Sequence, residues 1–116
     1  MEFQKTGTVV AELWCSDFQE SLRFYTESLG FRIGQHKAGS SHAYLLLGTA
    51  QIMISNFAQD GTWETGPFSR PLGRGINFSF FINDVQSFYD KLVSDGISPF
   101  VDLYTIWYWR PDCMAN

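Results

Sequence analysis

The segment SDFQESLRFYTESLGFRI, residues 16–33, determines the fold expected for this chain. Its apolar side chains recur at helical spacing, at Phe18, Leu22, Tyr25 and Leu29, and the positions between them are mostly polar. This pattern predicts an amphipathic helix of about three turns, which packs one face on the rest of the protein.

Both ends of this helix are marked in the sequence. Ser16 and Asp17 are residue types that accept the free backbone N–H groups of a first helical turn, and Gln19 and Glu20 complete two overlapping capping boxes. Gly30 is placed to end the helix in the left-handed conformation. The helix is therefore expected to start after these caps and to stop at the glycine.

A weaker copy of the segment occupies residues 83–100, NDVQSFYDKLVSDGISPF. Asp84 takes the capping position of Asp17, and Gly96 takes the terminating position of Gly30. The interval from cap to glycine is 13 residues in the first copy (30 − 17) and 12 in the second (96 − 84), so the second helix has lost one residue. A pattern that occurs twice at this spacing predicts two copies of one supersecondary unit and not a solenoid.

Extended segments surround the first helix. Residues 8–15 (TVVAELWC) are rich in β-formers, and three further segments, residues 31–36, 42–47 and 51–56, are separated by turns short enough for hairpins. The first module, residues 8–56, is therefore predicted to have the order β-α-β-β-β.

The rest of the chain divides into a linker, a second module and a tail. Residues 57–74 are interrupted by glycine and proline and are predicted to be the linker. Module two, residues 75–109, is predicted to contain a strand over residues 75–82, the second helix and an extended run from residue 97, and to be incomplete. Residues 110–116 form the tail. An incomplete sheet has an unpaired edge that favours a partner, so a homodimer is expected.

The composition of the 116-residue chain limits its function classes. A net charge of −4 disfavours nucleic acid, because phosphate contacts need clustered Lys and Arg. No apolar run approaches the roughly 20 residues of a membrane span, and no signal-peptide core is present, so a cytoplasmic protein is expected. Aromatic residues make up 17% of the chain, and these rings need a core, a pocket or an interface to hold them.

The first helix and the linker together resemble a known family. The pattern D-x-x-x-S-L-x-F-Y-x-x-x-L-G-F in residues 17–31 and the linker motifs in residues 65–75 are similar to those of the glyoxalase/bleomycin resistance protein/extradiol dioxygenase (vicinal oxygen chelate, VOC) superfamily. Within it they resemble the bleomycin-resistance-like branch more than the metal enzymes. The resemblance implies an α+β fold of two βαβββ-type modules whose sheets curve round a cavity, with the second module truncated in this chain.

The resemblance also implies where a metal ion would lie. Metal-using members place a His on the first strand of each module, and the corresponding positions here are Val10 and Asn77. Their Glu ligand would fall on a strand that is not predicted in this chain. Because a catalytic metal site needs about three protein ligands, no metal and no other cofactor is expected. His36 and His42 flank a hairpin and are expected to be ordinary surface residues.

Glu12 and Trp14 are the main candidates on the first strand, since the family geometry points both into the cavity. A carboxylate beside an indole suits a cationic group, or acts as a base if burial raises its pKa. The alternative, which the sequence favours, is an ion pair of Glu12 with Arg32, Arg74 or Lys37.

The aromatic residues not needed for helix packing, which include Tyr104 and Trp109, are predicted to line a ligand groove or, equally, a core or dimer interface. The predicted ligand-binding residues are Glu12, Trp14, Trp63, Asn77, Phe81, Trp107 and Tyr108; none is assigned a catalytic role.

By resemblance, the protein is expected to bind a small aromatic or cationic molecule without a metal, and to sequester an antibiotic of the bleomycin type. Two alternatives stay open: a metal-dependent lyase, thiol transferase or dioxygenase with atypical ligands, and a truncated relic or mobile cassette product that only self-associates.

Overall fold

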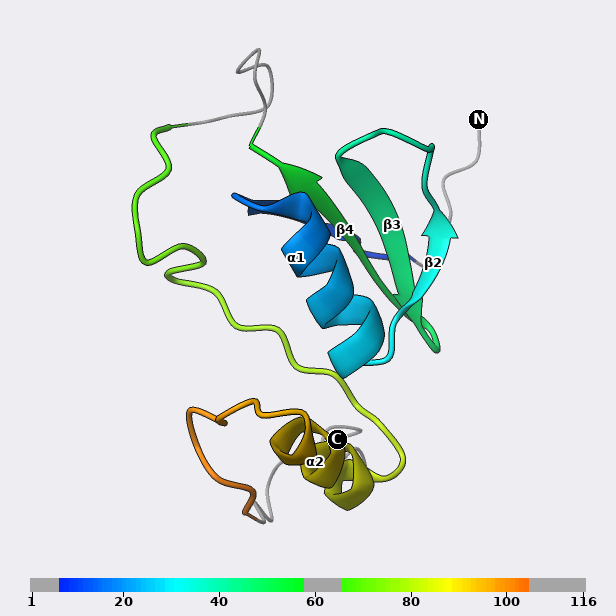
Figure 1. Cartoon of the computed structure of the whole chain (residues 1–116), viewed down its shortest axis with the longest axis vertical. Helices are drawn as coiled ribbons and strands as arrows, with labels where there is room; N and C mark the ends of the chain where they lie inside the picture. Colours follow the sequence, from blue (N-terminus) through cyan, green and yellow to red (C-terminus); the bar gives the residue numbers. More distant parts are fainter. Residues whose placement is uncertain (1–6, 58–65, 105–116) are drawn as a thin grey trace. The chain divides into compact units, whose positions relative to one another are not determined.

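The structure is a computed structural model of the chain and describes residues 7–57 and 66–104 (Figure 1). The chain divides into two compact units between Phe81 and Ile82. The end of the predicted linker and the start of predicted module two thus belong to the first compact unit. The modules over residues 8–56 and 75–109 are defined by a repeated sequence pattern, whereas the compact units are defined by packing, so their boundaries need not coincide. The division into modules stays a prediction.

The first unit contains a mixed sheet of four strands in the order β1-β4-β3-β2. The strands are β1 (Ala11–Cys15), β2 (Arg32–Gln35), β3 (His42–Leu47) and β4 (Ala50–Asn56). β1 runs parallel to β4, with Leu13 opposite Ile54, and β3 is antiparallel to both of its neighbours. The predicted β-α-β-β-β order is confirmed. The largest difference between the predicted and the observed strand bounds is in β1, which begins at Ala11 and not at Thr8.

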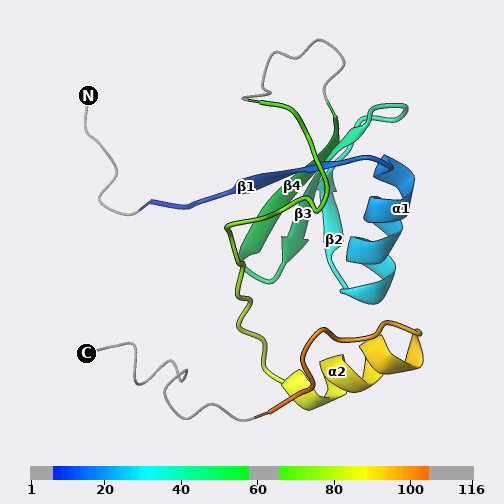
Figure 2. The ribbon, with the colours of Figure 1, turned by 90° about the vertical axis from the view of Figure 1, so that its left-hand side faces the viewer.

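The helix of this unit lies against one side of the sheet (Figure 2). It begins as α1 (Phe18–Arg23) and continues as the π-helical turn η1 (Phe24–Ser28). The Asp17 carboxylate accepts the backbone N–H of Glu20 at 3.1 Å, so of the two predicted capping boxes it is the Asp17 cap that forms. Gly30, with φ of 83°, follows the helix end as predicted.

The core of the first unit lies between the helix and the sheet. Its fully buried apolar residues are Phe18, Phe31, Ala43, Leu45, Ile52 and Ile54. Alternation along β3 and β4 puts their buried side chains on one face of the sheet, and Leu22, Tyr25 and Leu29 pack against this cluster. The helical face predicted from the sequence is confirmed.

The second unit contains α2 (Val85–Ser94). The Asp84 carboxylate accepts the backbone N–H of Ser87 at 3.0 Å, and Gly96 has φ of 84°, so the predicted start and stop of this helix are confirmed. No residue of α2 is buried. None of the helices in the described residues is long and apolar enough to cross a membrane.

The strand predicted at residues 75–82 is wrong, and the extended run predicted from residue 97 is not part of a strand as far as residue 104, where the described residues end. A strand exists only with a hydrogen-bonded neighbour, and within residues 66–104 neither segment has one. Apolar alternation in GINFSFFI therefore does not by itself produce a sheet. What the described residues retain of the second module is its capped helix.

Candidate ligand pocket

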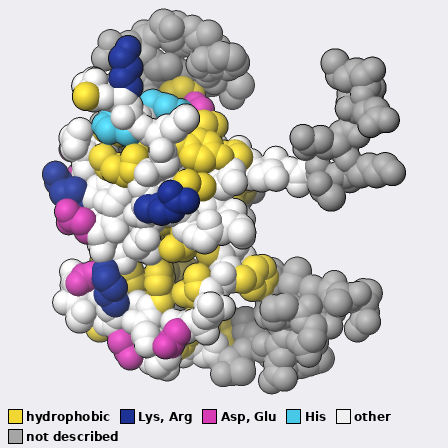
Figure 3. Space-filling model, turned by 90° about the vertical axis from the view of Figure 1, so that its right-hand side faces the viewer, with side chains coloured by type: hydrophobic (Ala, Val, Ile, Leu, Met, Phe, Trp, Pro, Cys, Tyr) yellow, Lys and Arg dark blue, Asp and Glu magenta, His cyan; other side chains and the backbone are white. Residues whose placement is uncertain are grey.

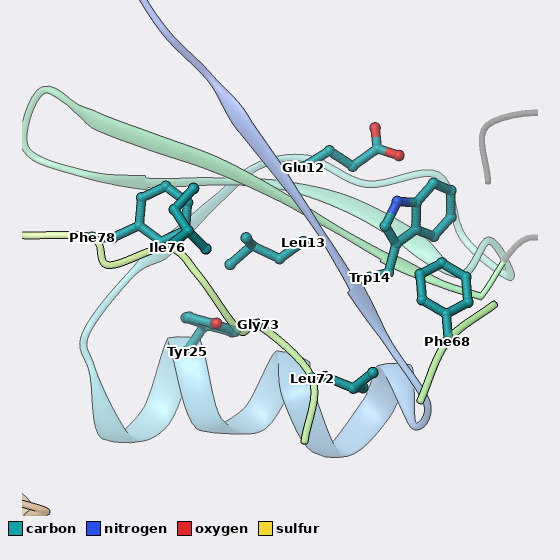
Figure 4. A pocket seen from close by; sticks show the side chains of 9 residues that line it. All are labelled: Glu12, Leu13, Trp14, Tyr25, Phe68, Leu72, Gly73, Ile76 and Phe78. Carbon is teal, nitrogen blue, oxygen red and sulfur yellow. The ribbon is translucent and has the colours of Figure 1, made fainter. Parts of the chain in front are cut away.

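A pocket of about 420 Å³ opens beside β1, which is a terminal strand of the sheet (Figure 4). One wall comes from β1 and the helix, and the other comes from residues 66–81, a segment that we call the strap. The lining residues are Glu12, Leu13, Trp14, Tyr25, Phe68, Leu72, Gly73, Ile76 and Phe78.

Ring contacts hold the strap in place at both ends. Near its start, Phe68 stacks on Phe57 with ring centroids 4.4 Å apart and an interplanar angle of 8°, and it also contacts Trp14 at 6.1 Å. Near its end, Phe80 meets the buried Phe31 edge to face at 5.6 Å. Such pairs contribute about 0.5–1.5 kcal/mol each beyond their buried area, so the strap is a defined wall of the pocket.

A hydrogen bond adds a polar anchor to the strap. The Arg70 guanidinium donates to the Ser16 hydroxyl at 3.1 Å, and this bond joins the strap to the residue before the first helix cap. Further along, the Arg74 guanidinium donates to the Ser69 hydroxyl at 3.0 Å, within the strap itself. Arg74 is therefore engaged locally and does not pair with Glu12.

Three of the lining residues carry polar side-chain groups: Glu12, which is exposed, a carboxylate, Trp14 an indole N–H and Tyr25 a hydroxyl. Within the described part of the chain, none of them has a hydrogen-bond or ion-pair partner. The ion pair that the sequence favoured for Glu12 is therefore wrong as far as Arg32, Arg74 and Lys37 are concerned. The pocket offers one acceptor of charge −1 and two neutral donors to a ligand.

The sequence profile of the Glyoxalase/Bleomycin resistance protein/Dioxygenase superfamily matches residues 7–105. The chain belongs to this superfamily.

Solved structures with this superfamily's fold match the chain. A glyoxalase/bleomycin resistance protein/dioxygenase from Nocardioides has a TM-score of 0.65 and 18% identity, over 91% of this chain and 73% of that one. The bleomycin resistance determinant encoded on the transposon Tn5 has a TM-score of 0.57 and 24% identity, over 85% and 72%. An integron cassette protein from a Halifax Harbour sewage outfall has a TM-score of 0.55 and 19% identity, over 78% and 71%.

At these identities the similarity shows the fold alone. The chain spans 63% of the length of a superfamily member from Vibrio splendidus. No curated protein is similar enough to the chain to be matched to it. Membership of the superfamily therefore does not by itself assign an activity to this chain.

The structure brings two of the predicted ligand-binding residues together, because Glu12 and Trp14 both line the pocket. Asn77 and Phe81 lie on the strap, are exposed, and are not among the lining residues. The remaining three, Trp63, Trp107 and Tyr108, lie outside the described residues. A role of these five in ligand binding stays a prediction.

Several lining residues were missed from the sequence, among them Tyr25, Phe68, Ile76 and Phe78. The sequence predicts Tyr25 only as part of the helix's core stripe, although the hydroxyl of a tyrosine in such a stripe needs a polar partner. Ile76 and Phe78 alternate as if on one face, and this pattern predicts a strand and not a pocket wall. Phe68 carried no periodic signal.

Burial shifts two titratable groups near the pocket. Desolvation raises the pKa of the Tyr25 phenol, and the neighbouring Cys15 adds to the shift, so Tyr25 is a neutral donor near neutral pH. Desolvation also raises the pKa of the Cys15 thiol, which donates to the Ser55 carbonyl at 3.3 Å. A protonated, hydrogen-bonded thiol is a poor nucleophile.

The two histidines lie in another hollow, of about 660 Å³, at the β2–β3 hairpin, and reach the surface (cyan in Figure 3). His36 Nδ1 donates to the His42 carbonyl oxygen at 3.0 Å, and His42 Nδ1 is hydrogen-bonded to the Ser55 hydroxyl. Across residues 7–57 and 66–104, no group of three or more His, Cys, Asp or Glu is placed to hold a metal ion. Metal independence itself stays a prediction.

Proposed function

We propose that the pocket beside β1 binds a small molecule with a flat apolar body and a cationic group, and holds it without transforming it and without a metal. One observation carries this proposal: Glu12, whose carboxylate has no partner among the described residues, lines the same pocket as the aromatic residues Trp14 and Phe68. The face of an indole ring attracts cations, and a nearby carboxylate increases the preference for cationic over neutral ligands. A volume of about 420 Å³ lies within the range of about 300–1,000 Å³ typical of small-molecule sites.

The compound class proposed is an aromatic, cationic antibiotic of the bleomycin type. The bleomycin resistance determinant of Tn5 shares the fold, which makes bleomycin the first compound to test. A homodimer and a cytoplasmic location belong to the same proposal, the first because α2 buries none of its residues within the described chain.

The test is an isothermal titration of bleomycin and of 2-naphthylmethylammonium into EDTA-treated protein. We expect saturable binding, and we expect Glu12→Gln to weaken the binding of the cation about tenfold, which corresponds to about 1.4 kcal/mol. Glu20→Gln is the matched control, since Glu20 is an exposed carboxylate outside this pocket and caps the helix only through its backbone.

Two results would overturn the proposal. The first is flat titrations across a panel of planar cations. The second is stoichiometric Zn²⁺, Mn²⁺ or Fe²⁺ in untreated protein together with loss of binding after chelation, which would establish the metal-dependent alternative.

A further inference from the structure

We infer that Tyr25 determines the specificity of this pocket by donating a hydrogen bond from its hydroxyl to an oxygen acceptor on the ligand. The inference rests on the proposed function and narrows the ligand to a planar aromatic cation that carries a carbonyl or ether oxygen away from its charge. Tyr25 is then a binding residue that distinguishes between cations of the same size.

The two ends of the ligand are separated by the strand. Alternation puts Glu12 and Trp14 on one face of β1, whereas Leu13 packs with the core on the helix side. Tyr25 comes from the helix and lies on that second side, as Figure 4 shows. A ligand that reaches both Glu12 and Tyr25 therefore passes the edge of β1, with its charge and its acceptor at opposite ends.

Two ring contacts hold the Tyr25 side chain in place. The ring meets Phe24 edge to face at 5.3 Å and Phe31 at 5.8 Å, and Phe31 is itself buried. Within the described residues the hydroxyl has no hydrogen-bond partner. Gly73 lines the same pocket, and a Cβ added there would meet nothing within 4 Å, so the pocket has open space at this wall. A hydroxyl held at a fixed position in a pocket distinguishes ligands with an oxygen acceptor from ligands without one, because a ligand that lacks the acceptor forms no hydrogen bond with it.

The position of Tyr25 in the helix supports a role beyond packing. Tyr25 and Leu92 are each the eighth residue after their capping aspartate, Asp17 and Asp84. In the second unit this position is aliphatic and lies in a regular α-helix. In the first unit it is a tyrosine inside the π-turn η1, where the Leu29 N–H donates to the Phe24 carbonyl five residues back at 3.0 Å. A π-turn adds one residue to an α-helix, and such insertions occur frequently at functional sites.

The experiment compares two probes that differ only in the acceptor: 2-naphthylmethylammonium and its 6-acetyl derivative. We expect the native protein to bind the acetyl probe about tenfold more tightly than the parent, as one hydrogen bond in a partly buried site provides. Tyr25→Phe keeps the ring and should abolish this preference, so that the two probes bind the variant with equal affinity. Tyr44→Phe is the control, because the Tyr44 hydroxyl is bonded to Gln51 and does not line this pocket.

The outcomes separate the two claims. If neither probe binds the native protein, the proposed function fails. If both bind and Tyr25→Phe leaves their affinity ratio unchanged, only the role of Tyr25 is overturned. Far-ultraviolet circular dichroism of each variant checks that it is folded, and Tyr25→Leu, which removes the ring and takes the residue found at Leu92, should weaken both probes.

Discussion

The helix of the first unit and the helix of the second unit begin and end in the same way, and they differ in what covers them. Asp17 and Asp84 each accept a backbone N–H from the third residue after them. Gly30 and Gly96 each follow the helix end with φ near 83°. The first helix packs on a four-stranded sheet, whereas α2 buries none of its residues within the described chain.

This difference separates local from tertiary information. Caps and glycines act within a few residues of sequence, so they produce the same ends in both units. Burial depends on strands that pair, and only the first module has paired strands among the described residues. The π-turn and the pocket both occur where the helix meets the sheet, which suggests that tertiary packing stabilises the one irregular turn.

The largest expected effect comes from the apolar residue that directly follows each capping aspartate. Phe18 is 5% exposed and Val85 is 48% exposed. Phe18→Ala should destabilise the protein by about 3–5 kcal/mol, because it leaves a cavity under the helix. Val85→Ala should change the stability by less than about 0.5 kcal/mol. Urea denaturation followed by circular dichroism measures both.

Phe18→Leu keeps most of the volume and should cost about 1.5 kcal/mol or less, which keeps the comparison measurable if Phe18→Ala does not fold. A cost for Val85→Ala as large as that for Phe18→Ala would contradict the contrast. It would show that α2 is buried in the protein in solution, as a second copy of the chain would bury it.

A smaller effect is expected at the two glycines. At Gly30 and at Gly96 an added Cβ meets nothing within 4 Å, so an alanine there causes no steric clash. It should lower the stability only because its backbone is forced into the left-handed conformation, by roughly 1–2 kcal/mol at each site. Gly30→Ala should lower the stability of the whole first unit. Gly96→Ala should lower the hydrogen-exchange protection of α2 alone. Equal loss of protection in β3 for both variants would show that the two units unfold as one.

Much of the first unit was predictable because its signals are local and periodic. The stripe of Phe18, Leu22, Tyr25 and Leu29, the Asp17 cap and the Gly30 stop all agree with the structure. The π-turn was not predicted, since the stripe reads as a regular helix. Only the extra residue between cap and glycine indicated it, and that residue was interpreted as a loss in the second helix.

The candidate site was predictable only in part. Glu12 and Trp14 follow from alternation along a strand together with the family's cavity geometry. The opposite wall was not predictable, because Phe68 and Phe78 reach the pocket through contacts between segments far apart in the sequence. The apolar alternation of residues 75–82 predicts a strand, and the absence of a paired neighbour in the described chain decides against one.

The smallest expected effect distinguishes the two caps themselves. The Asp84 carboxylate accepts both the backbone N–H and the hydroxyl of Ser87, at 3.0 and 2.7 Å, and these bonds hold its pKa below the ordinary value. The cap's contribution to helix stability is therefore complete above the ordinary carboxyl pKa, and it is lost as pH falls through the lowered value. Glu20, at the matching position of the first helix, offers Asp17 only its backbone N–H.

Ser87→Ala removes the hydroxyl and keeps the backbone bond, so it should raise the pKa of Asp84 only part of the way back. An NMR titration of the Asp84 carboxyl carbon measures this shift. Ser94→Ala is the control, since its hydroxyl donates to the Lys91 carbonyl at the other end of α2. An Asp84 titration unchanged by Ser87→Ala would mean that the backbone bond alone lowers the pKa. The two helix starts would then be equivalent, and every difference between the helices would come from the sheet.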